Sequence, residues 1–224
     1  MIPLIEIARA RVPGHTEDIT LLKRGSEFSI RTAGKELMNS RLHASEALLA
    51  RLACDRLERR TGRRILIGGL GMGYTLAAAL EQSQPDTHIT VSELVPAVVE
   101  WNRKHIGHLA GRPLDDPRVS IAQEDIAETI GRKRSAWDAI LLDVDNGPDG
   151  LTCKANDRLY ATPGLKSSHR ALRPGGILAI WSCGADAAFT RRLEQCGFRT
   201  QIVNVRARRP GKGARHTIWL AARP

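Results

Sequence analysis

The chain has 224 residues, 42% apolar and 26% charged, a composition typical of one globular domain with room for a small appendage. No apolar run approaches the roughly 20 residues that span a bilayer, and residues 1–6 lack the apolar segment of a signal peptide. The cysteines lie far apart, without a metal-binding spacing, at Cys54, Cys153, Cys183 and Cys196. We therefore expect a cytoplasmic protein with free thiols and no metal site, and not a membrane, secreted or disordered protein.

The formal net charge of +10 comes mainly from scattered arginines. Local clusters occur at residues 56–64, 131–134 and 206–215, and few aromatic residues lie among them. A base-stacking surface for nucleic acid needs such aromatic residues, so a solvated basic surface is the favoured interpretation. A nucleic-acid-binding surface is the alternative.

The first 44 residues differ from the rest. Residues 19–23 and 28–32 are short apolar-rich runs separated by a turn at Gly25, and they predict a small N-terminal β-hairpin. A helix is predicted to begin at Ser45, its N-cap, and to end near Gly62. We therefore expect two units, a hairpin region at 1–44 and an α/β domain at 45–224.

Strand and helix patterns alternate in the second unit. Predicted strands are residues 64–67, 88–92, 119–122, 137–143 and 177–181, followed by 199–206 and 216–222. Predicted helices are residues 74–82, 96–105, 159–172 and 185–196. The last two strands are joined by too short a link for a crossover helix, so they must be antiparallel. The pattern predicts an α/β fold with a doubly wound, mostly parallel seven-stranded sheet that closes with an antiparallel pair.

A glycine-rich turn, Gly68-Gly-Leu-Gly-Met-Gly-Tyr74, follows the first strand of this sheet. It lacks the Lys-Ser/Thr pair of a phosphate-binding P-loop. Glycines let the backbone approach a ligand, and ligands of open α/β sheets bind beyond the carboxyl ends of the strands. Gly69, Gly71 and Gly73 are therefore candidate cofactor-binding residues, and a turn that only packs helix on strand is the alternative.

Acidic residues stand at the ends of the next two strands. Glu93 lies 20 residues after Gly73, where a carboxylate accepts hydrogen bonds from both ribose hydroxyls. Glu124 and Asp125 follow the third strand, where an adenine amino group is expected. Each acid alone also fits a solvated surface, but the three together predict an adenosine-containing ligand.

The glycine spacing also fits a nicotinamide dinucleotide. However, Leu172-Arg-Pro-Gly-Gly176 before the fifth strand and the closing antiparallel pair both resemble S-adenosylmethionine-dependent transferases. A sulfonium ligand of this kind needs no pyrophosphate cradle. We therefore expect S-adenosylmethionine or its decarboxylated form as cofactor.

A third acidic segment, Asp143-Val-Asp-Asn-Gly-Pro-Asp149, ends the fourth strand. A carboxylate beside the expected sulfonium can take a proton from a nucleophilic amine or hold a cationic substrate. Asp143 is the candidate catalytic residue, and Asp145 and Asp149 deepen the negative field. The Asp-Asn-Gly-Pro run is also strong turn chemistry, so a loop that merely ends the strand is the alternative.

From about Ile19 to Ala222 the chain resembles the spermidine synthase (polyamine aminopropyltransferase) family, within the S-adenosylmethionine-dependent methyltransferase fold superfamily. The resemblance lies in the glycine loop, in Leu159-Tyr160, and in four acids, Glu46, Glu93, Asp125 and Asp143, with Asp145 a looser counterpart. Two segments depart from the family: Ala44-Ser45 replaces a tyrosine and an amide or imidazole, and Val144–Pro148 replaces a Ser-Ser-Asp-Pro element.

The resemblance implies a transferase that moves an aminopropyl group, or a related group, from the adenosyl sulfonium to a small amine, and implies a homodimer. Asp143 and Asp145 are then catalytic, and Glu46, Asp149 and Tyr160 contact the substrate. The adenosyl group contacts Gly69, Gly71, Gly73, Glu93, Glu124 and Asp125. A small-molecule methyltransferase and a non-catalytic basic binding module are the alternative functions.

Overall fold

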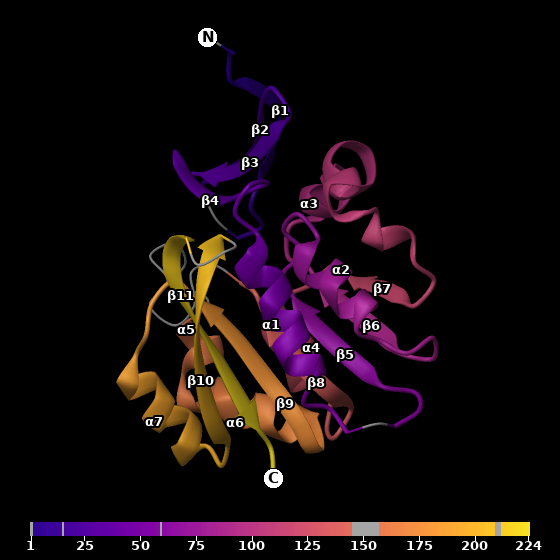
Figure 1. Cartoon of the computed structure of the whole chain (residues 1–224), viewed down its shortest axis with the longest axis vertical. Coiled ribbons are helices and arrows are strands. Elements are labelled where there is room, and N and C mark those ends of the chain that lie inside the picture. The colour runs from indigo at the N-terminus through magenta and orange to yellow at the C-terminus, as the bar shows by residue number, and fades with distance from the viewer. Residues whose placement is uncertain (1, 15, 59, 145–156, 209–211) are drawn as a thin grey trace.

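The structure is a computed structural model, and it describes residues 2–14, 16–58, 60–144, 157–208 and 212–224. It contains two sheets (Figure 1). A four-stranded sheet from the N-terminal residues stands above one end of a seven-stranded sheet that has helices on both faces. Helix α1 (Ala44–Cys54) runs from the small sheet down along the large one.

The N-terminal sheet is antiparallel, in the order β1 (Ile5–Arg11), β2 (Asp18–Arg24), β3 (Glu27–Thr32), β4 (Lys35–Asn39). The predicted strands 19–23 and 28–32 are confirmed as β2 and β3, but the expected two-stranded hairpin is a four-stranded sheet. The edge strands β1 and β4 have no fully buried residue and include several charged side chains. In β1 the alternation of apolar and polar residues changes phase between Ile7 and Ala8, where the pairing register shifts, and β4 shows no alternation, so neither strand has a regular period of two.

The large sheet has the order β10-β11-β9-β8-β5-β6-β7. Its strands are β5 (Arg64–Gly68), β6 (His88–Ser92), β7 (Val119–Ala122), β8 (Trp137–Leu142), β9 (Leu172–Ser182), β10 (Arg199–Arg208) and β11 (Lys212–Ala222). The pairs among β5 to β9 are parallel, and β11 is antiparallel to both β9 and β10. The doubly wound, mostly parallel seven-stranded sheet is therefore confirmed.

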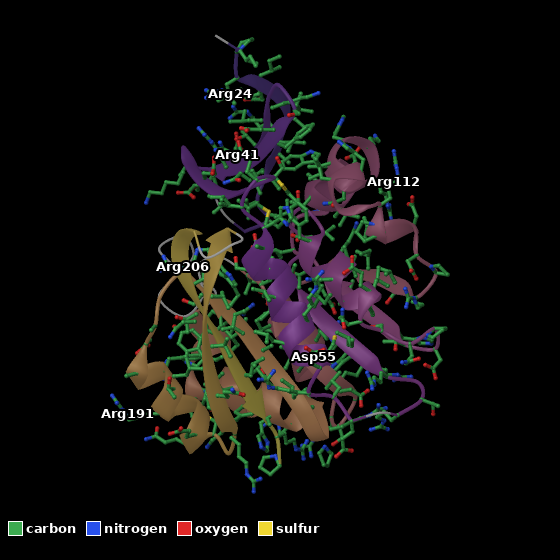
Figure 2. All side chains as sticks on the ribbon, viewed as in Figure 1. Arg24, Arg41, Asp55, Arg112, Arg191 and Arg206 are labelled. Atoms are coloured by element: carbon green, nitrogen blue, oxygen red, sulfur yellow. The ribbon has the colours of Figure 1, made fainter. Side chains whose placement is uncertain are left out.

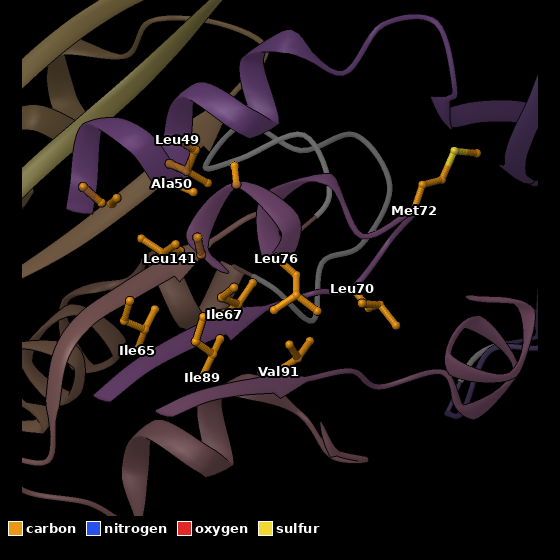
Figure 3. Close-up of a cluster of buried hydrophobic side chains, with 14 of the residues drawn as sticks. Leu49, Ala50, Ile65, Ile67, Leu70, Met72, Leu76, Ile89, Val91 and Leu141 are labelled. Atoms are coloured by element: carbon orange, nitrogen blue, oxygen red, sulfur yellow. The ribbon is translucent and has the colours of Figure 1, made fainter. Parts of the chain in front are cut away.

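Each face of this sheet has its own apolar core. Alternation along the strands sends Ile65 and Ile67 to one face and Leu66 to the other, as expected for a period of two. The first core is completed by Leu49 of α1 and Leu76 of α2 (Tyr74–Glu81), both nearly inaccessible to solvent (Figure 3). On the other face the core includes residues from α4 (Ile126–Gly131), α6 (Thr162–Ala171) and α7 (Ala187–Gln195). Burial on both faces fixes the strand ends where a site can form.

Helix α1 is shorter than predicted and begins differently. It ends at Cys54 instead of near Gly62, because Arg56 and Leu57 turn back with i to i−3 hydrogen bonds to Ala53 and Cys54. Its N-cap residue is His43, and the Ser45 hydroxyl, predicted to be the cap, bonds to side chains instead.

The other predicted helices are present with altered limits. The segment predicted as 96–105 is α3 (Pro96–Trp101), followed by a π-helical turn η1 (Asn102–Ile106) and the 3-10 turns η2 (Gly107–Ala110) and η3 (Pro113–Asp115). The segment predicted as 159–172 is α5 (Asp157–Tyr160) and α6, separated at Ala161, because Pro163 at the start of α6 cannot continue a preceding helix. Helix α4 was not predicted.

Candidate functional site

A cavity of about 510 Å³ lies where the carboxyl ends of β5, β6 and β8 meet the N-terminal sheet. Its apolar lining comes equally from the N-terminal residues (Val12, Pro13, Ile19, Ile30, Leu37 and Met38) and from the rest of the chain (Leu94, Val95, Val98, Ile126, Val144 and Trp181). Its polar lining comes mainly from the large sheet and from α1, and includes Glu46, Glu93, Asp125, Asp143 and Arg158. Its position at the carboxyl ends of parallel strands is the expected one for a ligand site.

Two of the three predicted glycines line this cavity. Gly69 has φ of +86°, and a Cβ on it would lie 2.7 Å from the backbone oxygen of Asp143, so only glycine fits between the two strand ends. Gly71 also lines the cavity. Gly73 does not; with φ of +84° it is the N-cap residue of α2, where it permits the turn from loop to helix.

Glu93 follows β6 and is 8% exposed. Its Oε2 accepts a hydrogen bond from the Leu70 amide and its Oε1 accepts one from the Val95 amide, both at 2.8 Å. Burial raises the pKa of Glu93, and backbone donors from the glycine loop oppose the rise. The carboxylate therefore braces the glycine loop while it faces the cavity.

Asp125 and Glu124 diverge at the end of β7. Asp125 lines the cavity; it caps α4 by accepting the Ala127 amide at 2.8 Å, and it pairs with Arg158 at 2.5 Å. Glu124 is outside the lining, because its carboxylate turns back onto α4 and accepts from Thr129 and Arg132. Those hydrogen bonds also lower the pKa of Glu124. The structure thus brings Asp125, but not Glu124, to the cavity.

Asp143 follows β8 directly and lines the cavity. Its Oδ2 accepts a hydrogen bond from the Thr75 hydroxyl at 2.5 Å, and its amide donates to the Gly68 carbonyl at 3.1 Å. Burial raises the pKa of Asp143, and the Thr75 hydrogen bond partly offsets that rise. Asp145 and Asp149 lie outside the described residues, so their predicted roles stay predictions.

Glu46 lies in the first turn of α1, is 8% exposed, and faces the same cavity as Asp143. Its Oε2 accepts a hydrogen bond from the Ser45 hydroxyl at 2.7 Å. Burial, together with the negative charge of Asp143, raises the pKa of Glu46 to about 7. Two carboxyl groups from distant parts of the sequence therefore interact electrostatically in one cavity.

Tyr160, predicted to contact a substrate, is a core residue. Its side chain is 2% exposed, its ring meets Phe189 edge to face with centroids 5.9 Å apart, and its hydroxyl donates to the Val144 carbonyl at 3.4 Å. The structure does not bring it into the cavity lining.

Several site residues were missed by the sequence analysis. Thr75 holds Asp143, Arg158 pairs with Asp125, and Glu17 and Trp181 line the cavity. Thr75 lies in the first turn of the helix after the glycine loop, and this position could have identified it as a site residue. No sequence pattern identifies Glu17 or Trp181, because only the tertiary fold brings the loop before β2 and the end of β9 to the cavity.

The cavity has a strong acidic bias. Among the described lining residues, five are carboxylates (Glu17, Glu46, Glu93, Asp125, Asp143) and one is a cation, Arg158, already paired with Asp125. A protein with a net charge of +10 therefore has a negative cavity. Such a cavity attracts cations and repels anions.

The other described arginines lie outside the cavity lining and are dispersed. Figure 2 labels Arg24, Arg112 and Arg191 on well-separated elements. Within the predicted clusters, Arg60 pairs with Asp138 at 3.2 Å and Arg132 pairs with two nearby glutamates, while residues 206–215 are only partly described. In the described part of the chain no group of His, Cys, Asp and Glu could hold a metal, and no helix has the length and apolar character to cross a membrane.

Comparison with known proteins gives consistent matches. The model of the spermine/spermidine synthase domain matches residues 49–188. Polyamine aminopropyltransferase 2 of Pseudomonas aeruginosa is 32% identical over 122 residues, which cover 53% of this chain and 33% of that protein. A polyamine aminopropyltransferase of Korarchaeum cryptofilum is 29% identical over 121 residues, which cover 54% of this chain and 36% of that protein. The chain thus spans about a third of the length of these curated relatives.

Two solved spermidine synthase structures share the fold. One, a complex with the transition-state analogue AdoDATO, has a TM-score of 0.76 at 17% identity and covers 98% of this chain and 72% of that chain. The other, from Thermotoga maritima, has a TM-score of 0.76 at 16% identity with the same coverage. These similarities confirm the methyltransferase-like fold, and the domain match covers more than half of the sequence. The chain therefore belongs to the spermine/spermidine synthase family.

Proposed function

We propose that this protein is an aminopropyltransferase that moves an aminopropyl group from decarboxylated S-adenosylmethionine to a small amine. The observation that carries the proposal is the acidic cavity at the carboxyl ends of β5, β6 and β8, where Glu46 and Asp143 meet beside the glycine loop. Membership in the spermine/spermidine synthase family supports the same reaction class.

The residues at one end of the cavity fit an adenosyl group. Gly69 and Gly71 have no side chain to keep a ligand from the backbone. Backbone amides hold the Glu93 carboxylate at the cavity, where it is an acceptor for the ribose hydroxyls. Asp125, held by Arg158 and by the first turn of α4, is an acceptor for the adenine amino group. A volume of about 510 Å³ is ample for a ligand of this size.

Charge favours the decarboxylated donor over S-adenosylmethionine itself. The additional carboxylate of S-adenosylmethionine would enter a cavity whose described lining has five carboxylates and one cation, Arg158, which is already paired. Like charges in a partly desolvated site cost several kcal/mol. The same argument weighs against the alternative of a small-molecule methyltransferase, because that reaction requires S-adenosylmethionine.

The protein's own groups supply binding and proton transfer. The donor supplies a carbon activated by a sulfonium, with a neutral thioether as leaving group. Asp143 takes the proton that the acceptor amine loses as its nitrogen forms the new bond; the raised pKa of Asp143 makes it a stronger base than an ordinary aspartate. Thr75 holds Asp143 in place, and Glu46 binds an ammonium group of the acceptor.

The test has two stages. Calorimetry with decarboxylated S-adenosylmethionine, S-adenosylmethionine and methylthioadenosine should give tightest binding for the first and third. A panel of diamines with the decarboxylated donor should then release methylthioadenosine, detected by chromatography. The matched control is Glu100→Gln, which removes an exposed carboxylate paired with Lys104. Absence of both binding and release in the parent protein would overturn the proposal.

The homodimer and the cytoplasmic location expected from the sequence remain predictions.

A further inference from the structure

Behind Glu46 lies a histidine from the other end of the chain. His216 is on β11, and α1 packs against β9 and β11 (Figure 1). The His216 Nδ1 atom is 3.0 Å from the Ser45 Oγ, and that hydroxyl donates to Glu46 Oε2 at 2.7 Å. Ser45 is fully buried, so the three side chains form a hydrogen-bonded series from the sheet to the cavity.

When Glu46 is ionised, the number of hydrogens fixes the direction of these bonds. A serine hydroxyl has one hydrogen, and Ser45 gives it to the Glu46 carboxylate. The Ser45 oxygen can then only accept from His216, which requires the hydrogen on Nδ1. Burial lowers the pKa of His216, which is consistent with a neutral imidazole. The ring is also fixed by packing, because it meets the Trp181 ring edge to face with centroids 4.6 Å apart.

We infer that His216 is a positioning residue that, through Ser45, holds the Glu46 carboxylate in the orientation that binds an ammonium group of the acceptor. The role in acceptor binding rests on the proposed function; the hydrogen-bonded series itself does not. A serine hydroxyl alone can rotate, and a donor behind it leaves only one orientation in which both bonds are made. Accepting a hydrogen bond from His216 also polarises the Ser45 hydroxyl and so strengthens its bond to the Glu46 carboxylate.

Three variants separate this role from simple packing. Ser45→Ala removes the series, and His216→Phe keeps a ring against Trp181 but removes the donor. His216→Asn restores a donor close to the position of Nδ1. The matched control is His169→Phe, since His169 also packs edge to face on an aromatic ring, Phe198, outside the cavity lining.

Kinetics give the first measurement. With decarboxylated S-adenosylmethionine and a diamine, His216→Phe and Ser45→Ala should each raise the KM of the amine about tenfold, with the Kd of the adenosyl ligand unchanged. The double variant should be no worse than Ser45→Ala, and His216→Asn should recover most of the loss. Additive losses, or a loss in His169→Phe equal to that in His216→Phe, would overturn the inference.

Nuclear magnetic resonance gives a second measurement that needs no turnover. In protein labelled with ¹⁵N-histidine, His216 should be the Nδ1–H tautomer, and Ser45→Ala should shift its ring nitrogens. The Glu46 carboxyl should titrate at higher pH in Ser45→Ala, because the hydrogen bond from Ser45 lowers its pKa. Asp143, after β8, and Tyr74, at the start of α2, also interact electrostatically with Glu46 and are the same in both proteins.

The kinetic and resonance measurements test the proposed function and the hydrogen-bonded series separately. A parent protein without turnover would overturn the proposed function, and the resonance data would still decide the hydrogen-bonded series. An Nε2–H tautomer, or a Glu46 titration that Ser45→Ala leaves unchanged, would overturn the inference even in an active enzyme.

Discussion

Replacing Glu46 by glutamine should make the protein more stable at alkaline pH. Glu46 is 8% exposed, and burial together with the charge of Asp143 raises its pKa from the ordinary 4.5 to about 7. Glutamine has nearly the same shape and keeps an oxygen that accepts from Ser45. It carries no charge, so it avoids both the burial of an ionised carboxylate and its repulsion by Asp143.

The direction follows from proton binding in the two states. In the unfolded chain Glu46 loses its proton near pH 4.5, and in the folded protein near pH 7. Between these values the folded state binds the additional proton, so the free energy of unfolding falls as the pH rises, and the loss is complete above the folded pKa. A pKa change from 4.5 to about 7 corresponds to about 3 kcal/mol. Glu46→Gln should therefore gain about 3 kcal/mol at pH 8 and only a few tenths at about pH 4.

Urea denaturation of both proteins at the two pH values measures this difference. The matched control is Glu100→Gln, because Glu100 is exposed and Lys104 lowers its pKa, so no alkaline gain is expected. A gain of equal size at both pH values would show that the effect is packing and not charge. A variant less stable than the parent at pH 8 would refute the electrostatic reasoning altogether.

Three further predictions concern the proposed reaction. Asp143→Asn should lower single-turnover rates about 10²–10⁴-fold and leave calorimetric binding of the adenosyl ligand nearly unchanged; full activity in this variant would remove Asp143 as the base. Glu93→Ala should weaken adenosyl binding about tenfold to a hundredfold and also lower the melting temperature, because two backbone amides lose their acceptor; unchanged affinity would contradict the ribose role. Gly69→Ala should lower both stability and turnover, because its Cβ would lie 2.7 Å from the Asp143 carbonyl oxygen. The control is Gly62→Ala, since Gly62 also has a positive φ but has open space around it. Equal effects of the two substitutions would mean that only the backbone conformation matters, and not the contact with Asp143.

The parallel sheet was predictable from the sequence for a local reason. Residues 65–67 and 139–142 are buried on both faces of the sheet, so they appear as continuous apolar runs bounded by glycines or charges. The residues that follow such runs must lie at the sheet's carboxyl edge. Glu93 and Asp143 could therefore be identified from their places in the sequence alone.

The remaining features depend on tertiary contacts. Ser45 has the residue type of a helix cap, and only the fold places a histidine 171 positions away against its hydroxyl. Glu124 and Asp125 are adjacent in sequence, yet the first turn of α4 directs them apart. Tyr160 ends α5, close enough to the strand-end loops to suggest a site residue, but its burial against α7 is invisible to a sequence pattern.

The strand order has a consequence for how the protein folds. β10 forms the sheet edge and pairs with β11, yet β11 comes later in the chain and separates β10 from β9. The pairing of β10 with β11 is local, but the addition of β11 to the free edge of β9 is a non-local pairing, and such pairings slow folding. Until then the edge of β9 can pair with another chain, which is a route to aggregation. His216 arrives with this strand, so the hydrogen-bonded series behind Glu46 is completed only when β11 joins the sheet.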